Sequence, residues 1–161
     1  MTDVQAKLID LLGDFSNAML VTQKPDGGLD ARPMAIARVD DDGDLWFATD
    51  RNSGKVAEIK HDDDVVVTMQ QNNKFVSLSG KCKLVDDRGK VAELWQEPWR
   101  VWFPGGKDDP SILLLHVDAV GGEYWDNSGV EGIQYLLKAG LAYVQGKQAE
   151  TDSQINASTK L

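Results

Sequence analysis

The sequence has few of the residues that form disulfides and metal sites. Its 161 residues include one cysteine, Cys82, and two histidines, His61 and His116. One cysteine cannot form an internal disulfide, and Cys82 lies in an alternating, strand-like segment, so a buried and unreactive thiol is expected. Two histidines do not favour a metal site built from several imidazoles. The sequence also lacks a Gly-x-Gly-x-x-Gly fingerprint and a Walker loop, so a conventional nucleotide-binding fold has no support.

Long apolar runs and excess positive charge are also missing. No stretch approaches the ~20 apolar residues that span a bilayer, and no basic segment followed by an apolar run resembles a signal peptide. The chain has 26 acidic and 17 basic side chains, a net charge of -9, which disfavours binding to nucleic acid or anionic membrane. We therefore expect a soluble, cytoplasmic protein in which any anionic ligand is held by a few placed groups.

The hydrophobic pattern predicts a mainly β fold with peripheral helices. Thr2 and Gln5 resemble a capping box that begins a first helix. Further helices are expected after Ser53, after Asp86 or Asp87, and over residues 130–139. Strands are expected over residues 19–22, 29–39, 45–49, 65–69, 75–85, and 112–120 with 123–125, the first three forming a meander. About six strands with short connections predict a small closed antiparallel barrel. The expected domain covers residues 1–145, and residues 146–161 are expected to be a polar, flexible tail.

A local reversal of charge sign marks a candidate phosphate site. Thr49, Ser53 and Lys55 lie around an expected helix start, and Arg32 lies on a nearby expected strand. The first amides of a helix lack internal acceptors and attract anions, and the hydroxyls and cations could add hydrogen bonds. The alternative is that Ser53 is only a helix cap and Lys55 a solvated residue of the first turn.

A second set of residues could contact a flat ligand. Pro33 has no backbone N-H to donate, so the segment around it suits an edge strand that is free to meet a ligand. Met34, Trp46 and Trp102 could bracket an aromatic ring system. Alternatively, these side chains belong to the core or to a dimer interface, where large apolar residues are common.

Several motifs together resemble a known family. They are Arg32-Pro33-Met34, Leu45-Trp46-Phe47-Ala48-Thr49, Ser53-Gly54-Lys55, Phe75-Val76-Ser77-Leu78-Ser79-Gly80, Trp102-Phe103-Pro104-Gly105-Gly106 and Glu123-Tyr124-Trp125-Asp126. In order and spacing, over about Leu8 to Asp126, the chain is similar to the general stress protein branch of the pyridoxamine 5'-phosphate oxidase-like flavoproteins. The resemblance implies a six-stranded antiparallel split β-barrel and a homodimer with FMN in two clefts at the subunit interface.

The resemblance also implies roles for individual residues. Arg32, Thr49, Ser53 and Lys55 would bind the FMN phosphate. Along the isoalloxazine ring and ribityl chain would lie Pro33, Met34, Trp46, Phe47 and Ala48, and the partner subunit would contribute Gln70 and Trp102. No catalytic residue and no metal ligand is assigned, and FAD in place of FMN remains open.

Departures from the family pattern bear on activity. True pyridoxamine phosphate oxidases have an Arg-x-His motif that helps to hold the substrate, whereas this chain continues from Trp125 with Asp126-Asn127-Ser128-Gly129. Gly54 and Phe75 also replace a basic residue and a glutamine of those oxidases. We therefore expect a flavin-dependent oxidoreductase with another small-molecule substrate, or a stress protein that binds flavin without turnover. Haem ligation by His61 or His116 is a third hypothesis. The aromatic segment 95–103 predicts a homodimer.

Overall fold

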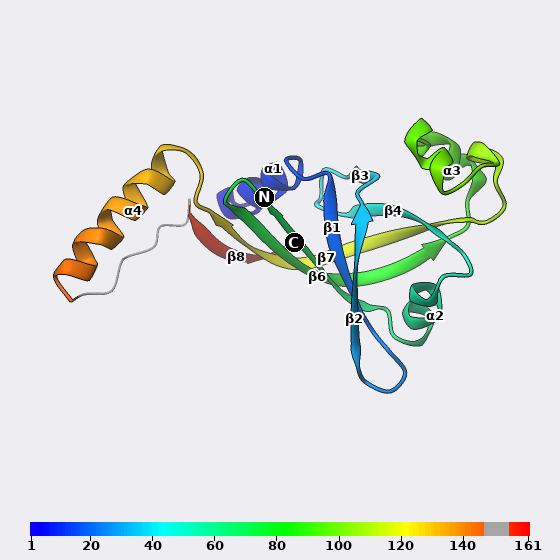
Figure 1. Ribbon diagram of the computed structural model, residues 1–161, viewed down its shortest axis with the longest axis horizontal. Helices are drawn as coiled ribbons and strands as arrows, with labels where there is room; N and C mark the ends of the chain where they lie inside the picture. The colour runs from blue at the N-terminus through cyan, green and yellow to red at the C-terminus, as the bar shows by residue number, and fades with distance from the viewer. Residues whose placement is uncertain (147–154) are drawn as a thin grey trace.

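Eight strands of the described chain form one curled antiparallel sheet (Figure 1). The computed structural model describes residues 1–146 and 155–161. The strands are β1 (Asn17–Gln23), β2 (Leu29–Ala35), β3 (Arg38–Val39), β4 (Leu45–Asp50), β5 (Asp64–Gln71), β6 (Lys74–Val85), β7 (Ile112–Asp126) and β8 (Asn156–Lys160). Their order is β2-β1-β5-β6-β7-β4-β3, and β8 pairs with β7. The sequence predicted about six strands; the two additional ones are the short β3 and β8.

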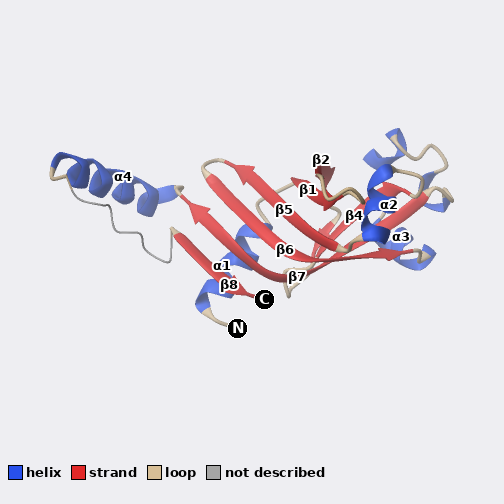
Figure 2. Ribbon diagram, turned by 90° about the horizontal axis from the view of Figure 1, so that it is seen from below, coloured by secondary structure: helices blue, strands red, loops and turns tan. Residues whose placement is uncertain are grey.

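Four α-helices and two 3-10 helices accompany the sheet in the described residues. They are α1 (Asp3–Leu12), α2 (Gly54–His61), α3 (Arg88–Leu94), η1 (Glu97–Val101), η2 (Gly106–Asp108) and α4 (Gly129–Val144). Figure 2 shows α1 against the sheet near β8, and α2 and α3 near its other end. No helix of the described chain is long and apolar enough to cross a membrane.

The sheet is curled into a split barrel, as the resemblance implied. Its two end strands, β2 and β3, follow each other in the chain and are joined only by Ile36 and Ala37. The Ile36 N-H donates to Ser16 O on the β1 side, and the Ala37 N-H donates to Trp46 O on β4. The expected strand 29–39 is therefore two strands that bind different neighbours.

The expected three-stranded meander has both of its pairings, β1 with β2 and β3 with β4, but its middle strand is interrupted at this point. β4 pairs with β3 and β7, and no pairing in the described sheet joins it to β2. The chain changes its hydrogen-bonding neighbour at residues 36 and 37, so β2 and β4 are not paired. The barrel is therefore open between these two strands rather than fully closed. This opening positions the site described below.

The main core fills the inside of the curl. Thr2 and Gln5 form the predicted capping box, and α1 then buries Leu8, Leu11 and Leu12 against the strands. Cys82 is buried in the same core, as predicted, and burial raises the pKa of its thiol to about 12. A thiol with such a pKa stays protonated and unreactive at neutral pH.

A second, aromatic-rich cluster covers the outer face of β4 and β7. It contains Trp46, Val91, Leu94, Trp99, Phe103, Ile112 and Leu114. Asp87 begins α3 by accepting a hydrogen bond from the Lys90 N-H, one of the two caps expected from the sequence. Part of the aromatic segment 95–103 is therefore core within one chain, although Val101 and Trp102 stay exposed.

The C-terminal residues differ from the expected flexible tail. The predicted last helix is present as α4, but residues 156–160 form β8 and pair with β7 from Gly121 to Trp125. Leu161 packs against the main core. Polar composition did not reveal this strand, because β8 is held by backbone hydrogen bonds to an otherwise free edge of β7. Residues 147–154 of the expected tail lie outside the described residues.

Candidate functional site

A cleft opens between β2 and β4, where the barrel is split. Its volume is about 540 Å³, within the range of roughly 300–1,000 Å³ typical of pockets for cofactors and small molecules. The lining residues are Pro33, Met34, Ala35, Ala48, Thr49, Asp50, Lys55, Trp99, Trp102 and Phe103. The cleft therefore has a polar end at the start of α2 and an apolar wall formed by β2 and the aromatic segment.

The polar end is built from two hydroxyls and one ammonium group. Lys55 Nζ donates to Thr49 Oγ1 at 3.0 Å, and Thr49 Oγ1 lies 3.1 Å from Ser53 Oγ. Ser53 occupies the N-cap position of α2 but makes no side-chain cap hydrogen bond. The Val56 N-H donates to Ser53 O, whereas the amides of Gly54 and Lys55 have no side-chain acceptor from the cap, which leaves these two available to an anion.

The space in front of the α2 start is open. A Cβ atom added at Gly54 would meet no atom within 4 Å. A ligand oxygen can therefore approach the backbone here without displacing a side chain. Because α2 also directs the positive end of its dipole to this point, the geometry favours a phosphate or carboxylate.

The ammonium group of Lys55 lies in an electrostatically unfavourable environment. Burial lowers the pKa of its ammonium group below the ordinary value, and the nearby positive charge of Arg32 lowers it further, while Asp50 and Glu58 act in the opposite direction. Two like charges are thus held close together in a partly buried place. An anion between or beside them would relieve this repulsion, which is the electrostatic signature expected of an anion site.

Arg32 lies beside the cleft rather than in its lining. Its guanidinium forms an ion pair with Glu58 at 2.9 Å and donates to Thr22 Oγ1. Both side chains of the ion pair are mostly buried, so the pair is strongly shielded from solvent. Arg32 therefore acts on the cleft through its charge, while Glu58 holds its guanidinium group beside the cleft.

The apolar wall combines a buried strand edge with aromatic rings. Met34, Trp99 and Phe103 are buried, while Trp102 is 66% exposed at the edge of the cleft. The sequence interpretation placed Trp102 in the cleft of the partner subunit. In this structure Trp102 borders the cleft of its own chain, because η1 folds back over β4.

Besides Arg32 and Ser53, three more candidate residues are absent from the lining of the cleft. Trp46 stacks on His116 with ring centroids 4.2 Å apart and donates from Nε1 to Asp40 at 2.7 Å. Phe47 is fully buried in the main core, and Gln70 is exposed on β5. The reason is the alternation along β4, which directs Trp46 outward under α3 and Phe47 inward to the core.

Four lining residues were not singled out from the sequence: Ala35, Asp50, Trp99 and Phe103. Ala35 and Asp50 each follow a predicted site residue directly along a strand. Trp99 lies three positions before Trp102 and four before Phe103, and this helical spacing within the aromatic segment was the signal that could have identified them.

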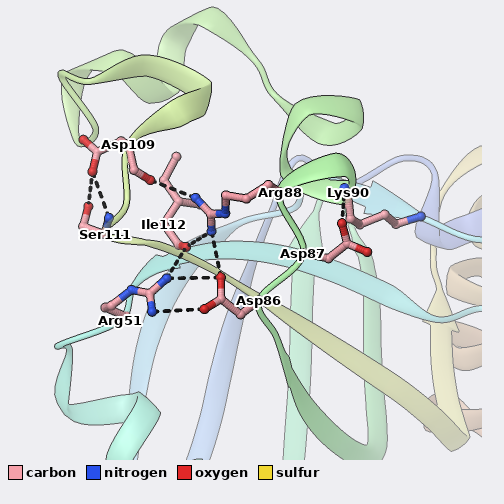
Figure 3. Close-up of polar contacts among 8 residues, drawn as sticks. All are labelled: Arg51, Asp86, Asp87, Arg88, Lys90, Asp109, Ser111 and Ile112. Carbon is pink, nitrogen blue, oxygen red and sulfur yellow. Dashed lines mark hydrogen bonds and ion pairs between the residues drawn. The ribbon is translucent and has the colours of Figure 1, made fainter.

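A network of charged side chains connects the aromatic lobe, which comprises α3, η1, η2 and their connections (residues 88–111), to the loop before α2 (Figure 3). Arg51 donates to both carboxylate oxygens of Asp86 at 3.1 and 3.2 Å, and Arg88 donates to the same carboxylate at 3.1 Å. Both guanidinium groups also reach Ile112 O, and Arg88 donates to Asp109 O. The hydrogen bonds from Arg51 hold the pKa of Asp86 below its usual value. This network positions two walls of the cleft relative to each other.

One acidic cluster in the described residues has the geometry of a possible cation site. Carboxylate oxygens of Asp62, Asp63 and Asp64 lie within 4.8 Å of one another. Lys81 Nζ lies 2.8 Å from both Asp63 and Asp64, so an ammonium group already balances part of this charge. The cluster lies apart from the lining of the cleft.

Comparison with known proteins identifies the family to which this split barrel belongs. The family model described as pyridoxamine 5'-phosphate oxidase like matches residues 3–150, and the chain belongs to this family. Among curated proteins, protein bli-3 of Neurospora crassa is 27% identical over 141 residues, covering 76% of this chain and 68% of that protein.

Solved structures of general stress proteins have the same fold. A candidate general stress protein 26 from Jannaschia sp. superposes with a TM-score of 0.76 at 24% identity, covering 100% of both chains. The general stress FMN/FAD binding protein of Xanthomonas citri superposes with a TM-score of 0.67 at 28% identity, covering 80% of this chain and 92% of its own. These likenesses agree with the family indicated by the sequence motifs.

Proposed function

We propose that this protein binds FMN in the cleft between β2 and β4 and acts as a flavin-dependent oxidoreductase on a small molecule. The observation that carries the proposal is the open start of α2, where Lys55, Thr49 and Ser53 converge beside an apolar wall. FMN has a phosphate at one end and a flat ring at the other, which match the polar end and the apolar wall of the cleft. The FMN/FAD binding relative from Xanthomonas citri supports the same ligand class.

The residues present fit FMN in both chemistry and space. Lys55, the two hydroxyls and the α2 amides would hold the phosphate, with the charge of Arg32 in support. Pro33, Met34 and Ala48 would lie along the flavin, and Trp102 would cover its ring. Bound there, the isoalloxazine supplies the electron transfer, while the chain orients it and excludes water from one side. FAD would fit as well, with its adenylate extending beyond the open phosphate end.

The substrate is not expected to be pyridoxamine phosphate. Among the described residues that line the cleft, Lys55 is the only cationic side chain, and it is assigned to the cofactor. A second phosphate would therefore find no positive partner there. A small, uncharged or weakly charged redox partner fits the apolar wall better, and its identity defines the activity.

We also propose that the active form is a cytoplasmic homodimer. The support is the exposure of Val101 at 80% and of Trp102 at 66% on the aromatic lobe, where a second chain would cover them. Gln70 would then act from the partner subunit.

A non-catalytic flavin-binding role is the second candidate function. It is favoured by the absence of the Arg-x-His motif that helps to hold the substrate in true pyridoxamine phosphate oxidases. His116 gives haem ligation no support, because it is bound to Asp44 at 2.9 Å and stacked on Trp46 outside the cleft lining.

A titration with two flavins tests the proposal. The purified protein is titrated with FMN and with riboflavin while the quenching of flavin fluorescence is followed. FMN should bind at least about tenfold tighter, since a charge-assisted hydrogen bond contributes roughly 1.5–3 kcal/mol. Equal affinities would contradict the phosphate assignment, and no binding of either flavin would contradict the function itself.

A redox experiment separates the two candidate functions. The flavin-loaded protein is reduced anaerobically with NADH or NADPH and then mixed with candidate electron acceptors, such as quinones. Sustained turnover supports the oxidoreductase role. Failure of the bound flavin to be reduced or reoxidised supports passive binding.

A further inference from the structure

Two separate parts of the chain form the polar end and the aromatic wall of the cleft. Thr49, Ser53 and Lys55 lie around the start of α2. Trp102 and Phe103 belong to the aromatic lobe, which the chain inserts between β6 and β7. A ligand that spans the cleft contacts both parts, so any residue that joins them also connects the two ends of the ligand.

Arg51 joins the two parts directly. It lies in the turn between β4 and α2, two positions before Ser53. Its backbone N-H donates to Ser111 O at 2.8 Å, and its guanidinium donates to Ile112 O at 3.4 Å. Both acceptors lie where the chain leaves the aromatic lobe and enters β7. Arg51 therefore holds one end of the lobe through its backbone and its side chain.

The same guanidinium holds the other end of the lobe (Figure 3). Arg51 forms a bidentate pair with Asp86, which follows β6 directly, at 3.1 and 3.2 Å. Arg88 donates to the same carboxylate, to Ile112 O and to Asp109 O. We call Asp86, Arg88, Asp109 and Ile112 the neck of the lobe. The two points where the lobe joins the sheet are thus bound to each other and to Arg51.

The turn that carries Arg51 also carries part of the phosphate site. The Asn52 N-H donates to Asp50 Oδ1 at 2.7 Å, and the Ser53 N-H donates to Asp50 O at 3.0 Å. These two hydrogen bonds close a tight turn, and Arg51 lies within it. An anion that is held at the start of α2 therefore restricts the position of Arg51 as well.

We propose that Arg51 is a positioning residue that couples the two ends of the cleft. A phosphate at the start of α2 fixes the turn, Arg51 then fixes the neck, and the neck places Trp102 and Phe103 against the flavin ring. The inference rests on the proposed flavin site. Coupling between two binding events is reciprocal, so a phosphate should raise the affinity for the ring, and the ring should raise the affinity for phosphate by the same factor.

A second set of ion pairs holds the same lobe at a different place. Arg38 on β3 pairs with Glu93 of α3 and, at 2.6 Å, with Asp40. Within the described residues, this set makes no hydrogen bond to the turn before α2. Arg38→Met therefore removes a guanidinium from the contacts of the lobe without breaking the proposed link. It is the matched control for Arg51→Met.

Riboflavin titrations with and without saturating inorganic phosphate test the coupling. The full-length protein is used, and chloride keeps the ionic strength constant so that general screening does not differ. The wild-type protein and Arg38→Met should bind riboflavin about fivefold tighter with phosphate, and Arg51→Met less than about twofold tighter. Equal riboflavin affinities with and without phosphate in the wild-type protein would overturn the coupling and leave the flavin site standing. No binding of riboflavin or FMN would overturn the proposed function as well.

Two further variants separate the link from the charge of Arg51. Arg51→Lys keeps the charge but cannot form the bidentate pair with Asp86, so it should lose the effect of phosphate. Asp86→Asn should lose this effect too, although it removes a negative charge. If Arg51 acted only through its charge, Arg51→Lys would keep the effect and Asp86→Asn would strengthen it. That pattern would overturn the proposal.

Hydrogen exchange gives an independent readout in the absence of flavin. The amides of Trp102 and Phe103 both donate to Trp99 O within the lobe. Phosphate alone should slow the exchange of these two amides in the wild-type protein and in Arg38→Met, but not in Arg51→Met. A lobe whose exchange does not respond to phosphate in the wild-type protein would contradict the role of Arg51.

Discussion

Lys55 is the residue on which the proposed phosphate site depends most. Its ammonium group lies 3.0 Å from Thr49 Oγ1 and lines the cleft. Lys55→Ala should weaken FMN binding by about 10- to 100-fold and riboflavin binding by less than about twofold, because only FMN has a phosphate. Fluorescence titration measures both. Lys60→Ala, an exposed lysine on the same helix, is the control and should change neither affinity appreciably.

The pKa of Lys55 predicts a pH dependence. Burial and the charge of Arg32 lower this pKa from its ordinary value of 10.5. As the pH rises through the lowered pKa, Lys55 loses its proton, so FMN affinity should fall while riboflavin affinity stays constant. Lys55→Arg should flatten the profile because arginine remains charged. A flat FMN profile in the wild-type protein would contradict the direct contact.

The lowered pKa of Lys55 also predicts how the free energy of unfolding changes with pH. In the free protein the folded state binds fewer protons at Lys55 than the unfolded state does, between the lowered pKa and 10.5. The contribution of Lys55 to the free energy of unfolding should therefore rise with pH over that window. Bound FMN should raise the pKa again and remove this rise.

Glu58 competes with a ligand for Arg32. The ion pair at 2.9 Å keeps the guanidinium beside the cleft. Glu58→Gln should increase FMN affinity severalfold, because Arg32 is released toward the phosphate. It should also lower the free energy of unfolding by about 2 kcal/mol, since a mostly buried cation loses its partner. Asp10→Asn, an exposed change of equal charge on α1, controls for net charge; equal effects of the two variants would refute the competition.

At the scale of elements, η1 contains a buried tryptophan, Trp99, and is followed by an exposed one, Trp102, with a different role. Trp99 is 4% exposed and Trp102 is 66% exposed. Trp99→Ala should cost about 3–5 kcal/mol of stability. Trp102→Ala should change stability by less than about 0.5 kcal/mol, but weaken FMN and riboflavin by the same factor, about three- to tenfold, because it contacts the ring they share. Thermal unfolding measures the changes in stability, and fluorescence titration measures the two affinities. A loss of affinity confined to FMN would contradict the contact between Trp102 and the flavin ring.

The sequence predicted most elements because local signals specified them. The capping box at Thr2, the alternation along β6 and the Asp87 cap each depend on neighbouring residues. The separation of β2 from β3 at Ile36 and Ala37 could not be predicted in this way, because both residues continue a strand-like pattern. Their hydrogen bonds go to partners far along the chain, and this long-range pairing creates the split.

The same distinction applies to the cleft. Motif order and spacing predicted Pro33, Met34, Ala48, Thr49, Lys55 and Trp102, which all line it. Trp46 and Phe47 belong to the same motif, but strand alternation directs them into two different cores. A linear motif does not record which of its side chains face a ligand. The position of Arg32, held by Glu58 from α2, also depends on tertiary contact.

For the whole molecule, the main feature is a local cationic site in an anionic protein. The chain has a net charge of -9, while Lys55 and Arg32 are close enough for the pKa of Lys55 to fall. Holding two like charges together is unfavourable in the free protein, and a bound phosphate would offset this repulsion by attracting both. The split barrel makes this possible, because β2 and β4 leave a gap at the start of α2.

A crystal structure of the protein with FMN tests this central claim most directly. We predict the phosphate at the start of α2, within hydrogen-bond distance of Lys55 Nζ and of a first-turn amide, with the ring against Met34 and Trp102. A flavin whose phosphate lies in solvent, or one bound outside the gap between β2 and β4, would contradict the account.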